Sequence, residues 1–543
     1  MSNGVWTMPA PKNEPIYNYG PGSPEKRRLK SELARLSSEI VEIPLVIGGK
    51  EIRTGDTDVC VMPHNHGHKL GIYHKAGPRE IEAAIDAALD AQAAWAALPW
   101  EQRAGVFLKA AEMISTDWRY TLNASTMLGI SKTVYQAEID STCELSDFWR
   151  FNVHYMEEIY RQQPASSPGV WNRVEYRPLE GFVFAVTPFN FTAIAGNLPT
   201  APAMLGNTVV WKPASSAVYN AYFVLKLLQE AGLPPGVINF IPGSGSAVGR
   251  QVMSHPALAG IHFTGSTAVF QDMWKTVGVN IDRYRAYPRI VGETGGKDFV
   301  FAHPSADVDS LRTALIRGAF EYQGQKCSAA SRAYIPRSLW DKLRDDLVSE
   351  AKGLTMGDVS DFTNFMGAVI DKAAFERIKG YIEYAGNSSE ARILAGGVCD
   401  DSVGYFIEPT IVETTNPKFK LMEEEIFGPV LTIYVYEDNE IEQTLELCDT
   451  TSPYGLTGAI FAQDRYAVAQ MTKDLTHAAG NFYVNDKPTG AVVGQQPFGG
   501  GRASGTNDKA GSMLNLLRWV SPRAIKENLV PPRDYRYPHM EEQ

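Results

Sequence analysis

The stretch from Glu321 to Ala329 places one cysteine where it can act as a nucleophile. Cys327 follows Lys326 and precedes small residues. A cysteine attacks as its thiolate, so it needs positive potential nearby and room for a substrate. Lys326 can supply the potential, and Ser328 with the alanines after it leaves the room. Glu293, 34 positions upstream (327 − 293), is a candidate base for activating water after a covalent intermediate has formed. These residues predict covalent thiol chemistry followed by hydrolysis.

The composition narrows the classes of protein. A chain of 543 residues is too long for one ordinary core, so we expect two or three domains. The net charge of −11 argues against binding to nucleic acid or to an anionic membrane. The ten histidines form no His-Glu-x-x-His pair and no Cys-x-x-Cys occurs, so we expect no metal site.

Cysteine usage and the N-terminus bear on the compartment. The five cysteines are few, widely spaced and odd in number, which favours a reducing compartment. The start of the chain, Met1 to Tyr19, lacks a hydrophobic signal core, so we expect no targeting segment. The alanine-rich stretch from Ala83 to Trp100 contains two aspartates, which predicts an amphipathic helix and no membrane span.

Short β-branched runs alternate with helical patterns between Gly181 and Val300. The predicted strands are 182–186, 208–211, 237–241, 260–263 and 289–291, and this spacing is typical of β-α-β units with a doubly wound parallel sheet. The run from Gly243 to Gly249 resembles a dinucleotide fingerprint with its third glycine one place late; an ordinary glycine-rich turn is an equal interpretation. A second α/β pattern begins after Gly295.

Two segments fall outside both patterns. The first is an extended run from Ser167 to Leu179, and the second is the proline-containing C-terminal tail. Segments of this kind often pair with a sheet edge of another subunit. Local packing on the protein's own surface is the alternative.

Further motifs join the cysteine and the glutamate. They are Thr187–Phe191, Lys212-Pro213, Phe263–Thr267, Glu424–Pro429 and Gln496–Gly500. In this order and spacing, from roughly Asn65 to Lys509, the chain resembles the aldehyde dehydrogenase superfamily. The resemblance implies an α/β fold with a Rossmann-type nucleotide domain, an α/β catalytic domain and a β-hairpin oligomerisation arm. The expected boundaries are 1–165 with 184–293 for the NAD-binding domain, 294–480 for the catalytic domain, and 166–183 with 481–543 for the arm and tail.

The resemblance assigns the catalytic roles. Cys327 is the expected nucleophile, and Glu293 deprotonates the water that hydrolyses the thioester. The amide of Asn190 and the Cys327 backbone N–H are the expected donors to the oxyanion. Taken singly, Asn190 could instead cap a turn and Glu293 could be a solvated carboxylate.

The resemblance also implies a nicotinamide cofactor. The residues expected to bind it are Lys212, Ser215, Gly265, Ser266, Glu425 and Phe427. Gly265 and Ser266 open a helix whose amides can meet the pyrophosphate. Members that strictly use NAD often carry a glutamate where this chain has Ser215, and that glutamate repels a 2′-phosphate. We therefore expect NAD and leave NADP open.

The distinguishing text points to the subfamily that oxidises L-glutamate 5-semialdehyde, which forms from 1-pyrroline-5-carboxylate in proline degradation, to L-glutamate. This text is 187–194, 293–297, 324–328 and 489–500. The residues expected to bind substrate are Phe191, Lys326, Ser328, Gly490, Ala491 and Phe498. Backbone N–H groups of Gly490 and Ala491 would grip the α-carboxylate, and Glu144, with no firm role, matches a carboxylate that lines the pocket in relatives.

Three alternatives remain. The first is another semialdehyde dehydrogenase of the superfamily, the second a coenzyme-A-acylating member, and the third a catalytically idle binding or structural protein. The last would be expected to lose Cys327, Glu293 or Asn190, and all three are present. As partners we expect a small-molecule substrate and a second copy of the chain, in a homodimer or higher homo-oligomer. The expected compartment is the bacterial cytoplasm or, for a eukaryotic source, the mitochondrial matrix.

Overall fold

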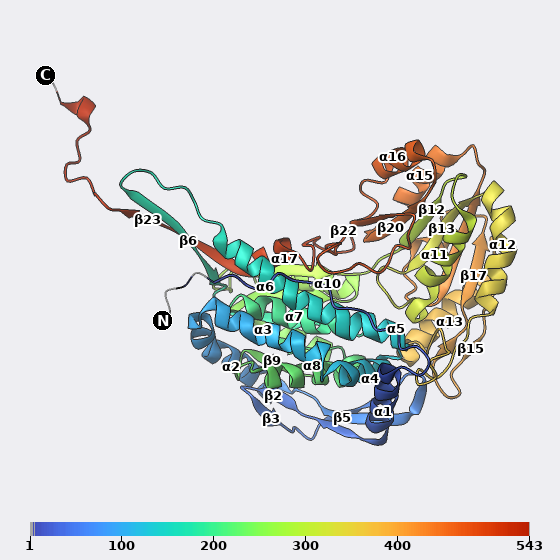
Figure 1. The fold of residues 1–543 in the computed structure, drawn as a ribbon, viewed down its shortest axis with the longest axis horizontal. Coiled ribbons are helices and arrows are strands. Elements are labelled where there is room, and N and C mark those ends of the chain that lie inside the picture. Colours follow the sequence, from blue (N-terminus) through green and yellow to red (C-terminus); the bar gives the residue numbers. More distant parts are fainter. Residues whose placement is uncertain (1–3, 5, 542–543) are drawn as a thin grey trace.

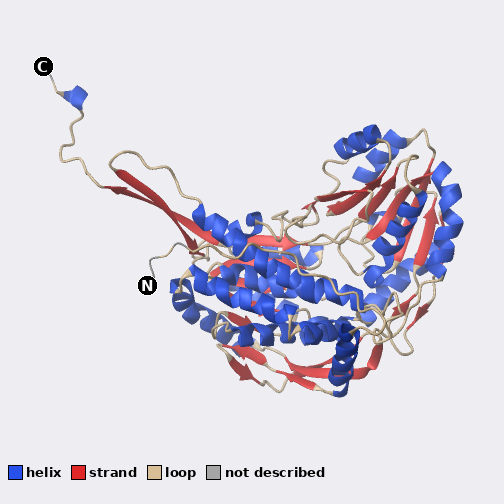
Figure 2. Ribbon diagram, in the orientation of Figure 1, coloured by secondary structure: helices blue, strands red, loops and turns tan. Residues whose placement is uncertain are grey.

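Two seven-stranded sheets, each covered by helices on both faces, organise the chain (Figures 1 and 2). The computed structural model describes residue 4 and residues 6–541. None of the helices in these residues is long and apolar enough to cross a membrane.

The first sheet confirms the predicted β-α-β pattern. In spatial order its strands are β11 (Arg289–Glu293), β10 (Leu258–Thr264), β7 (Phe182–Val186), β8 (Thr208–Lys212), β9 (Ile238–Phe240), β2 (Leu45–Ile47) and β3 (Lys50–Ile52). The strands from β11 to β9 are parallel, and β2 and β3 add an antiparallel edge. Strands β8, β9 and β10 are buried along their whole length, as a sheet covered on both faces requires.

Alternation along the strands sends side chains to two separate cores. Phe182 and Phe184 pack with one set of helices, and Val183 and Ala185 pack with the other, because successive strand residues point to opposite faces. The first set is α2 (Pro78–Ala97), α9 (Gly245–Ser254) and α10 (Thr267–Val279). The second set is α1 (Pro24–Ser38), α3 (Trp100–Ser115), α4 (Arg119–Ile130), α6 (Leu145–Arg161), α7 (Thr192–Met204) and α8 (Val218–Ala231).

The second sheet follows the pattern predicted after Gly295. In spatial order its strands are β14 (Ala391–Ala395), β17 (Thr410–Thr414), β18 (Val430–Tyr436), β13 (Ala330–Pro336), β12 (Asp298–Ala302), β20 (Thr457–Phe461) and β21 (Asn481–Val484). All are parallel except β14. One face packs on α11 (Val308–Phe320) and α12 (Arg337–Lys352), and the other on α13 (Lys372–Gly386), α15 (Ile441–Thr450) and α16 (Arg465–Asp474).

Short elements connect these layers. A small sheet contains β1 (Val41–Ile43), β5 (Asn65–His74) and β4 (Thr57–Met62), and two further pairs are β15 (Cys399–Asp400) with β16 (Phe406–Ile407) and β19 (Tyr454–Gly455) with β22 (Gly501–Arg502). The short helices are α5 (Val134–Ala137), η1 (Glu138–Glu144), η2 (Ser215–Ala217), η3 (Glu321–Gly324), α14 (Lys420–Glu423), α17 (Met513–Leu517) and η4 (Pro538–Met540). Of these, η1 is a π-helix that runs directly into α6, and π-helical segments are frequent at functional sites.

The two segments outside both patterns pair with each other. Strand β6 (Val170–Pro178) runs antiparallel to β23 (Val520–Asn528), and the ribbon projects from the body (Figure 1). The predicted hairpin is therefore a ribbon whose strands come from distant parts of the chain. Little of it is buried, because the ribbon has no core to cover.

Candidate active site

Three of the predicted catalytic and cofactor residues lie at the carboxyl ends of parallel strands in the first sheet. Lys212 ends β8, Glu293 ends β11, and Asn190 follows β7 after a three-residue turn. Ligands of open α/β sheets bind at this edge. Residues far apart in sequence thus reach one edge of the sheet.

A strained turn presents the nucleophile. Tyr322, Gln323 and Gly324 have φ values of 52°, 55° and 64°, a left-handed conformation that is rare for bulky residues. The side chain of Gln323 donates to the carbonyls of Ser131 at 3.0 Å and Ala368 at 2.7 Å, which holds the turn. A Cβ on Gly324 would lie 2.2 Å from the Gly428 carbonyl oxygen, so only glycine fits there. The chain then passes through Cys327 into β13.

The surroundings of Cys327 disfavour its thiolate. Burial raises the pKa of the thiol well above the usual range, and the carboxylates of Asp298, Glu293 and Glu425 raise it further. The ammonium of Lys326 donates to Glu321 Oε2 at 3.3 Å, so its charge is partly balanced there. That Lys326 supplies positive potential at the thiol stays a prediction.

Asn190 lies against the nucleophile turn. Its buried side-chain amide donates to the Gln325 carbonyl at 3.0 Å. That partner is 135 positions away, so the amide does not cap a local turn. An amide nitrogen carries two hydrogens, and the second makes no hydrogen bond to the described residues.

Glu293 is a half-buried acid, and its Oε2 is a buried oxygen without a partner among the described residues. Its Oε2 has no hydrogen-bond partner among the described residues, and burial raises its pKa well above the usual range. The interpretation of Glu293 as a solvated carboxylate is therefore wrong. The loop after Glu293 touches the nucleophile, since a Cβ on Gly296 would lie 2.1 Å from the Cys327 carbonyl oxygen. A carboxyl group with a raised pKa suits proton transfer near neutral pH.

Four of the expected cofactor residues, Lys212, Ser215, Gly265 and Ser266, lie at or after the carboxyl ends of β8 and β10. Burial lowers the pKa of Lys212 to about 8, and its Nζ lies 3.8 Å from where a Cβ of Gly245 would stand, at the start of α9. Ser266 caps α10 by accepting the Val269 N–H, and it follows Gly265. Ser215 is exposed at the start of η2. Two helix N-termini and an ammonium that makes no hydrogen bond to the described residues fit an anionic dinucleotide.

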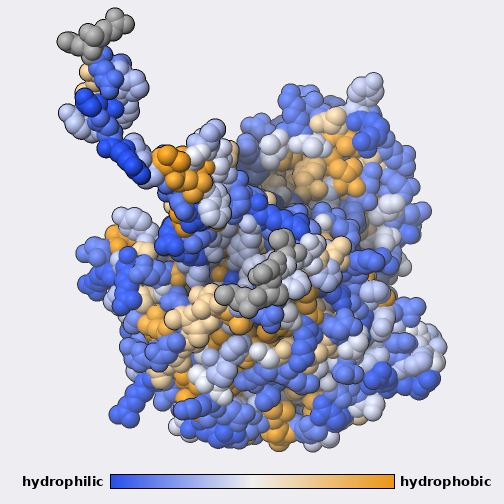
Figure 3. All heavy atoms as spheres, turned by 60° about the vertical axis from the view of Figure 1, so that its left-hand side comes forward, coloured by the Kyte–Doolittle hydropathy of each residue, from blue (hydrophilic) through white to orange (hydrophobic). Residues whose placement is uncertain are grey.

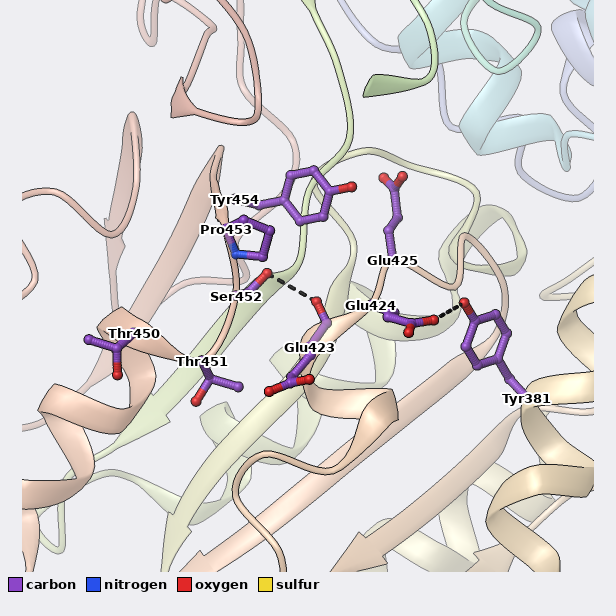
Figure 4. A pocket seen from close by; sticks show the side chains of 9 residues that line it. All are labelled: Tyr381, Glu423, Glu424, Glu425, Thr450, Thr451, Ser452, Pro453 and Tyr454. Atoms are coloured by element: carbon purple, nitrogen blue, oxygen red, sulfur yellow. Dashed lines mark hydrogen bonds between the residues drawn. The ribbon is translucent and has the colours of Figure 1, made fainter. Parts of the chain in front are cut away.

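Glu425 lines a cavity of about 700 Å³ (Figure 4). Glu425 Oε1 accepts the Gly296 N–H at 2.9 Å, and its carboxylate points away from the Tyr381–Glu424 hydrogen bond in Figure 4. Phe427 has a φ of 55° and packs edge-to-face on Phe189 at 5.8 Å between ring centroids. The cavity itself is lined by Tyr381, Glu423, Glu424, Glu425, Thr450, Thr451, Ser452, Pro453 and Tyr454. It adjoins the nucleophile's loop through Glu425 but does not include Cys327.

The residues expected to bind substrate flank Cys327 in the sequence or belong to the segment from 489 to 500. Ser328 donates to the Thr489 hydroxyl at 2.8 Å, so its own hydroxyl is already engaged. Gly490, with a φ of 98°, is exposed, and Ala491 is half-buried. Phe498 is held by two backbone hydrogen bonds to Ala510, of 3.0 and 2.7 Å.

Sequence reasoning missed a buried ionic cluster beside Phe191. Lys132 Nζ donates to Asp140 Oδ2 at 2.7 Å, with both side chains fully buried, and stands 3.8 Å from the Phe191 ring centroid. Burial, followed by the charge of Asp140, raises the pKa of Glu144 to about 8. Glu144 is thus no ordinary surface glutamate. No sequence pattern predicts that Lys132 lies beside the Phe191 ring, because the contact forms only in the folded chain.

A second missed cation stands beside the loop expected to bind the substrate carboxylate. Lys487 Nζ lies 3.3 Å from where a Cβ of Gly490 would be. Its positive charge lowers the pKa of Lys326, although burial and the neighbouring Glu321 have larger effects on that pKa. The lysine adds positive potential next to Gly490, and the Asp-Lys-Pro text around it gave no signal.

Comparison with known proteins agrees with this geometry. Residues 53–521 match the aldehyde dehydrogenase family. The chain is 56% identical to the mitochondrial delta-1-pyrroline-5-carboxylate dehydrogenase of Dictyostelium discoideum, over 98% of this chain and 96% of that protein. A crystal structure of the delta-pyrroline-5-carboxylate dehydrogenase from Mycobacterium tuberculosis bound with NAD has a TM-score of 0.97 and 54% identity, and covers 100% of both chains. The Thermus 1-pyrroline-5-carboxylate dehydrogenase with bound NAD has a TM-score of 0.90 and 33% identity, over 96% of this chain and 100% of that one.

Proposed function

The chain belongs to the aldehyde dehydrogenase family, and we propose that it oxidises L-glutamate 5-semialdehyde, formed from 1-pyrroline-5-carboxylate, to L-glutamate with NAD. This reaction is the second step of proline degradation. The observation that carries the proposal is the meeting of Cys327, Asn190 and Glu293, from three separate segments, at the cofactor edge of the first sheet. The relatives named above support the choice of substrate.

The first chemical step belongs to Cys327. Its sulfur attacks the aldehyde carbon, and the carbonyl oxygen becomes the oxyanion of a thiohemiacetal. The free N–H of Asn190 and the Cys327 backbone N–H stabilise that charge. Because burial raises the pKa of the thiol, a neighbouring base must take its proton as the substrate binds.

The second step belongs to Glu293. Bound NAD supplies the acceptor for the hydride that leaves the thiohemiacetal carbon, and the acyl group then remains on Cys327 as a thioester. Glu293 deprotonates a water, whose oxygen attacks the thioester carbon and releases the acid and the thiol. The partnerless Oε2 is the atom that accepts this proton. A coenzyme-A-acylating enzyme would have no use for such a base.

The cofactor is held by groups already described. Lys212 and Glu425 would bind the two riboses, and the N-terminus of α10 at Gly265 and Ser266 would bind the pyrophosphate. Phe427 packs at the nicotinamide end. Ser215 places no carboxylate near the adenosine ribose, so NADP binding is compatible with this site.

Substrate selection rests on the loop that we call the anchor loop, residues Thr489–Gln496. Backbone N–H groups of Gly490 and Ala491 bind the α-carboxylate of the substrate. Lys326 and Ser328 flank the thiol, and Phe191 with Phe498 packs on the methylenes of the substrate. Succinate semialdehyde also carries a carboxylate, but it lacks the α-ammonium and is one carbon shorter, so it would fit the distance between thiol and anchor loop less well.

The domain roles and the assembly follow the same proposal. The first sheet, from 1–165 and 184–293, binds NAD, and the second, from 294–480, carries the nucleophile. The expected boundary at 481 falls too early, because β21 (Asn481–Val484) belongs to the second sheet. The ribbon of β6 and β23, with the tail after it, pairs with a second copy in a homodimer or larger oligomer. Figure 3 shows this arm standing away from the body with an apolar patch, and its exposed apolar residues include Leu529 and Val530. A eukaryotic source would place the enzyme in the mitochondrial matrix and a bacterial source in the cytoplasm.

The test is NADH formation by the purified protein with 1-pyrroline-5-carboxylate, with succinate semialdehyde in parallel and Cys327→Ala as the control. We expect glutamate production that favours the pyrroline and disappears in the variant. Preference for succinate semialdehyde would leave the mechanism standing and overturn the substrate.

A further inference from the structure

The N-terminal segment lies along the helix that supports the active site. Its backbone N–H groups donate to three acidic side chains in turn: Met8 to Glu157, Glu14 to Asp147 and Tyr17 to Glu138. The segment therefore runs antiparallel to η1 and α6. The nineteen helical steps from residue 138 to residue 157 span roughly 28 Å, and nine extended steps from residue 8 to residue 17 span about 30 Å. The segment is therefore nearly fully extended along the helix, and Figure 1 shows it beside α6.

One residue of this segment reaches the anchor loop. The Asn13 side-chain amide donates to Asp147 Oδ2 and to the Val493 carbonyl, both at 2.8 Å. Its carbonyl oxygen accepts from Gln495 Nε2 at 3.0 Å. Both hydrogens and the oxygen of Asn13 are engaged, so the side chain fixes the anchor loop to α6 through Asp147.

The part of the anchor loop that Asn13 holds is a closed turn. The N–H groups of Gln495 and Gln496 both donate to the Val492 carbonyl at 3.0 Å, and the Val492 N–H donates to the Gln496 side chain at 2.9 Å. Gly494, with a φ of 82°, presses on Phe151 of α6; a Cβ there would lie 2.2 Å from the ring. The turn therefore packs against α6 too closely to accommodate a side chain at residue 494.

The other end of the anchor loop is fixed to the nucleophile's neighbour. Thr489 accepts the hydroxyl of Ser328 at 2.8 Å. Gly490 and Ala491 therefore lie between two fixed points of the anchor loop. One is the hydrogen bond to Ser328, and the other is the contact with Asn13 and Asp147. The distance between the thiol and the carboxylate-binding backbone depends on both attachments.

We propose that Asn13 is a positioning residue for substrate recognition: through Asp147, Val493 and Gln495 it sets where the anchor loop holds the substrate's α-carboxylate. The inference rests on the proposed function, because it assigns that carboxylate to Gly490 and Ala491. The Asn13 side chain makes no hydrogen bond to Cys327 or Glu293. Its removal should therefore weaken binding of the substrate's head group and leave the rate of the reaction at the aldehyde carbon unchanged.

Asn13→Ala removes all three side-chain hydrogen bonds and leaves the Val493 carbonyl and Asp147 without them. With several hydrogen bonds lost, we expect the KM for 1-pyrroline-5-carboxylate to rise about 5- to 20-fold, with kcat within about twofold of wild type. Asp147→Asn replaces the carboxylate that accepts the Asn13 amide by a second amide. This weakens the link between Asn13 and α6, and we expect the KM for 1-pyrroline-5-carboxylate to rise here too. Gln495→Ala, at an exposed residue, removes one contact and gives a smaller rise without a folding penalty.

The control is Tyr19→Phe. Tyr19 belongs to the same segment and donates to Glu138 at 2.7 Å, but makes no hydrogen bond to the anchor loop. If the segment matters only for stability, Tyr19→Phe and Asn13→Ala lower the thermal midpoint alike and leave both KM values unchanged.

The experiment measures kcat and KM of the full-length variants with 1-pyrroline-5-carboxylate and with propanal, which has no carboxylate. A KM rise confined to the pyrroline in Asn13→Ala and Asp147→Asn, graded in Gln495→Ala and absent in Tyr19→Phe, supports the inference. Equal losses for both substrates, or no KM change, overturn it while the proposed function stands. A wild-type enzyme that is active with propanal and inactive with the pyrroline overturns the proposed function itself, and the inference with it.

Discussion

The side-chain amide of Asn190 donates a 3.0 Å hydrogen bond to the carbonyl of Gln325, two residues before the nucleophile. This contact joins the turn after β7 to the turn before β13, one from each of the two large sheets. A displacement of one sheet against the other would therefore break this hydrogen bond and move Asn190 away from the turn that carries Cys327.

Asn190→Ala removes the side-chain donor to the oxyanion. Because such a donor stabilises charge that develops only in the transition state, we expect kcat to fall about 100- to 1,000-fold with a smaller change in KM. Steady-state NADH formation measures the loss, and far-UV circular dichroism checks the fold. A variant that keeps wild-type kcat would remove Asn190 from the mechanism.

Glu293→Gln keeps the shape of the side chain and removes the base for hydrolysis. The first turnover should still produce NADH, and turnover should then slow by about 100-fold or more because the thioester accumulates. Rapid-mixing absorbance detects the burst, and mass spectrometry of the quenched enzyme detects an acyl group on the Cys327 peptide. Steady turnover without a burst would contradict the assigned role.

The reactivity of Cys327 should increase with pH. A thiol with a raised pKa is deprotonated only at higher pH, so the thiolate fraction, and with it the rate of alkylation by iodoacetamide, should rise roughly tenfold per pH unit below that pKa. Peptide mass spectrometry follows the Cys327 adduct, and the fully buried Cys448 serves as an internal control. A rate that is already constant from about pH 6 would show a thiolate stabilised by its surroundings, against the direction of the shift.

Lys132→Met leaves Asp140 buried with an uncompensated charge. Breaking a fully buried ion pair in this way should lower the free energy of unfolding by about 3–5 kcal/mol, even though Asp140 still accepts the N–H groups of Thr192 and Ala193. Urea denaturation measures the change. The double variant Lys132→Met with Asp140→Asn removes the charge and should recover part of the loss; no loss in the single variant would mean that the pair contributes nothing.

Ser215→Glu places a carboxylate where the adenosine ribose is expected. Repulsion of the 2′-phosphate should raise the KM for NADP about tenfold and leave the KM for NAD within about twofold. The matched control is Ser216→Glu, which changes the neighbouring exposed serine. The same effect from both substitutions would show that residue 215 does not face the ribose.

Local sequence was sufficient for the elements, and it supplied the candidates for the reacting side chains. Strand β7 occupies the predicted residues 182–186, because a β-branched run between turns has few alternatives. The family fold was confirmed because motifs for the nucleophile, the base and the cofactor recur in a fixed order. The assignments of individual residues to cofactor and substrate stay predictions.

What local sequence did not determine are properties summed over distant segments. The pKa of Cys327 depends on burial and on three carboxylates, from β11, β12 and the loop before β18, which the residues adjacent to the cysteine do not reveal. The pairing of β6 with β23 joins strands that are more than three hundred positions apart, and no pattern in either segment names its partner.

The sequence by itself determined the family and the candidate reacting groups, because motifs of particular residue types recur in a fixed order. Only the tertiary structure decided their protonation and their supports: the anchor loop is held by Asn13, 480 positions from Val493. Such contacts form when the whole chain packs, and desolvation in that packed state sets the free energy of every charge in the site.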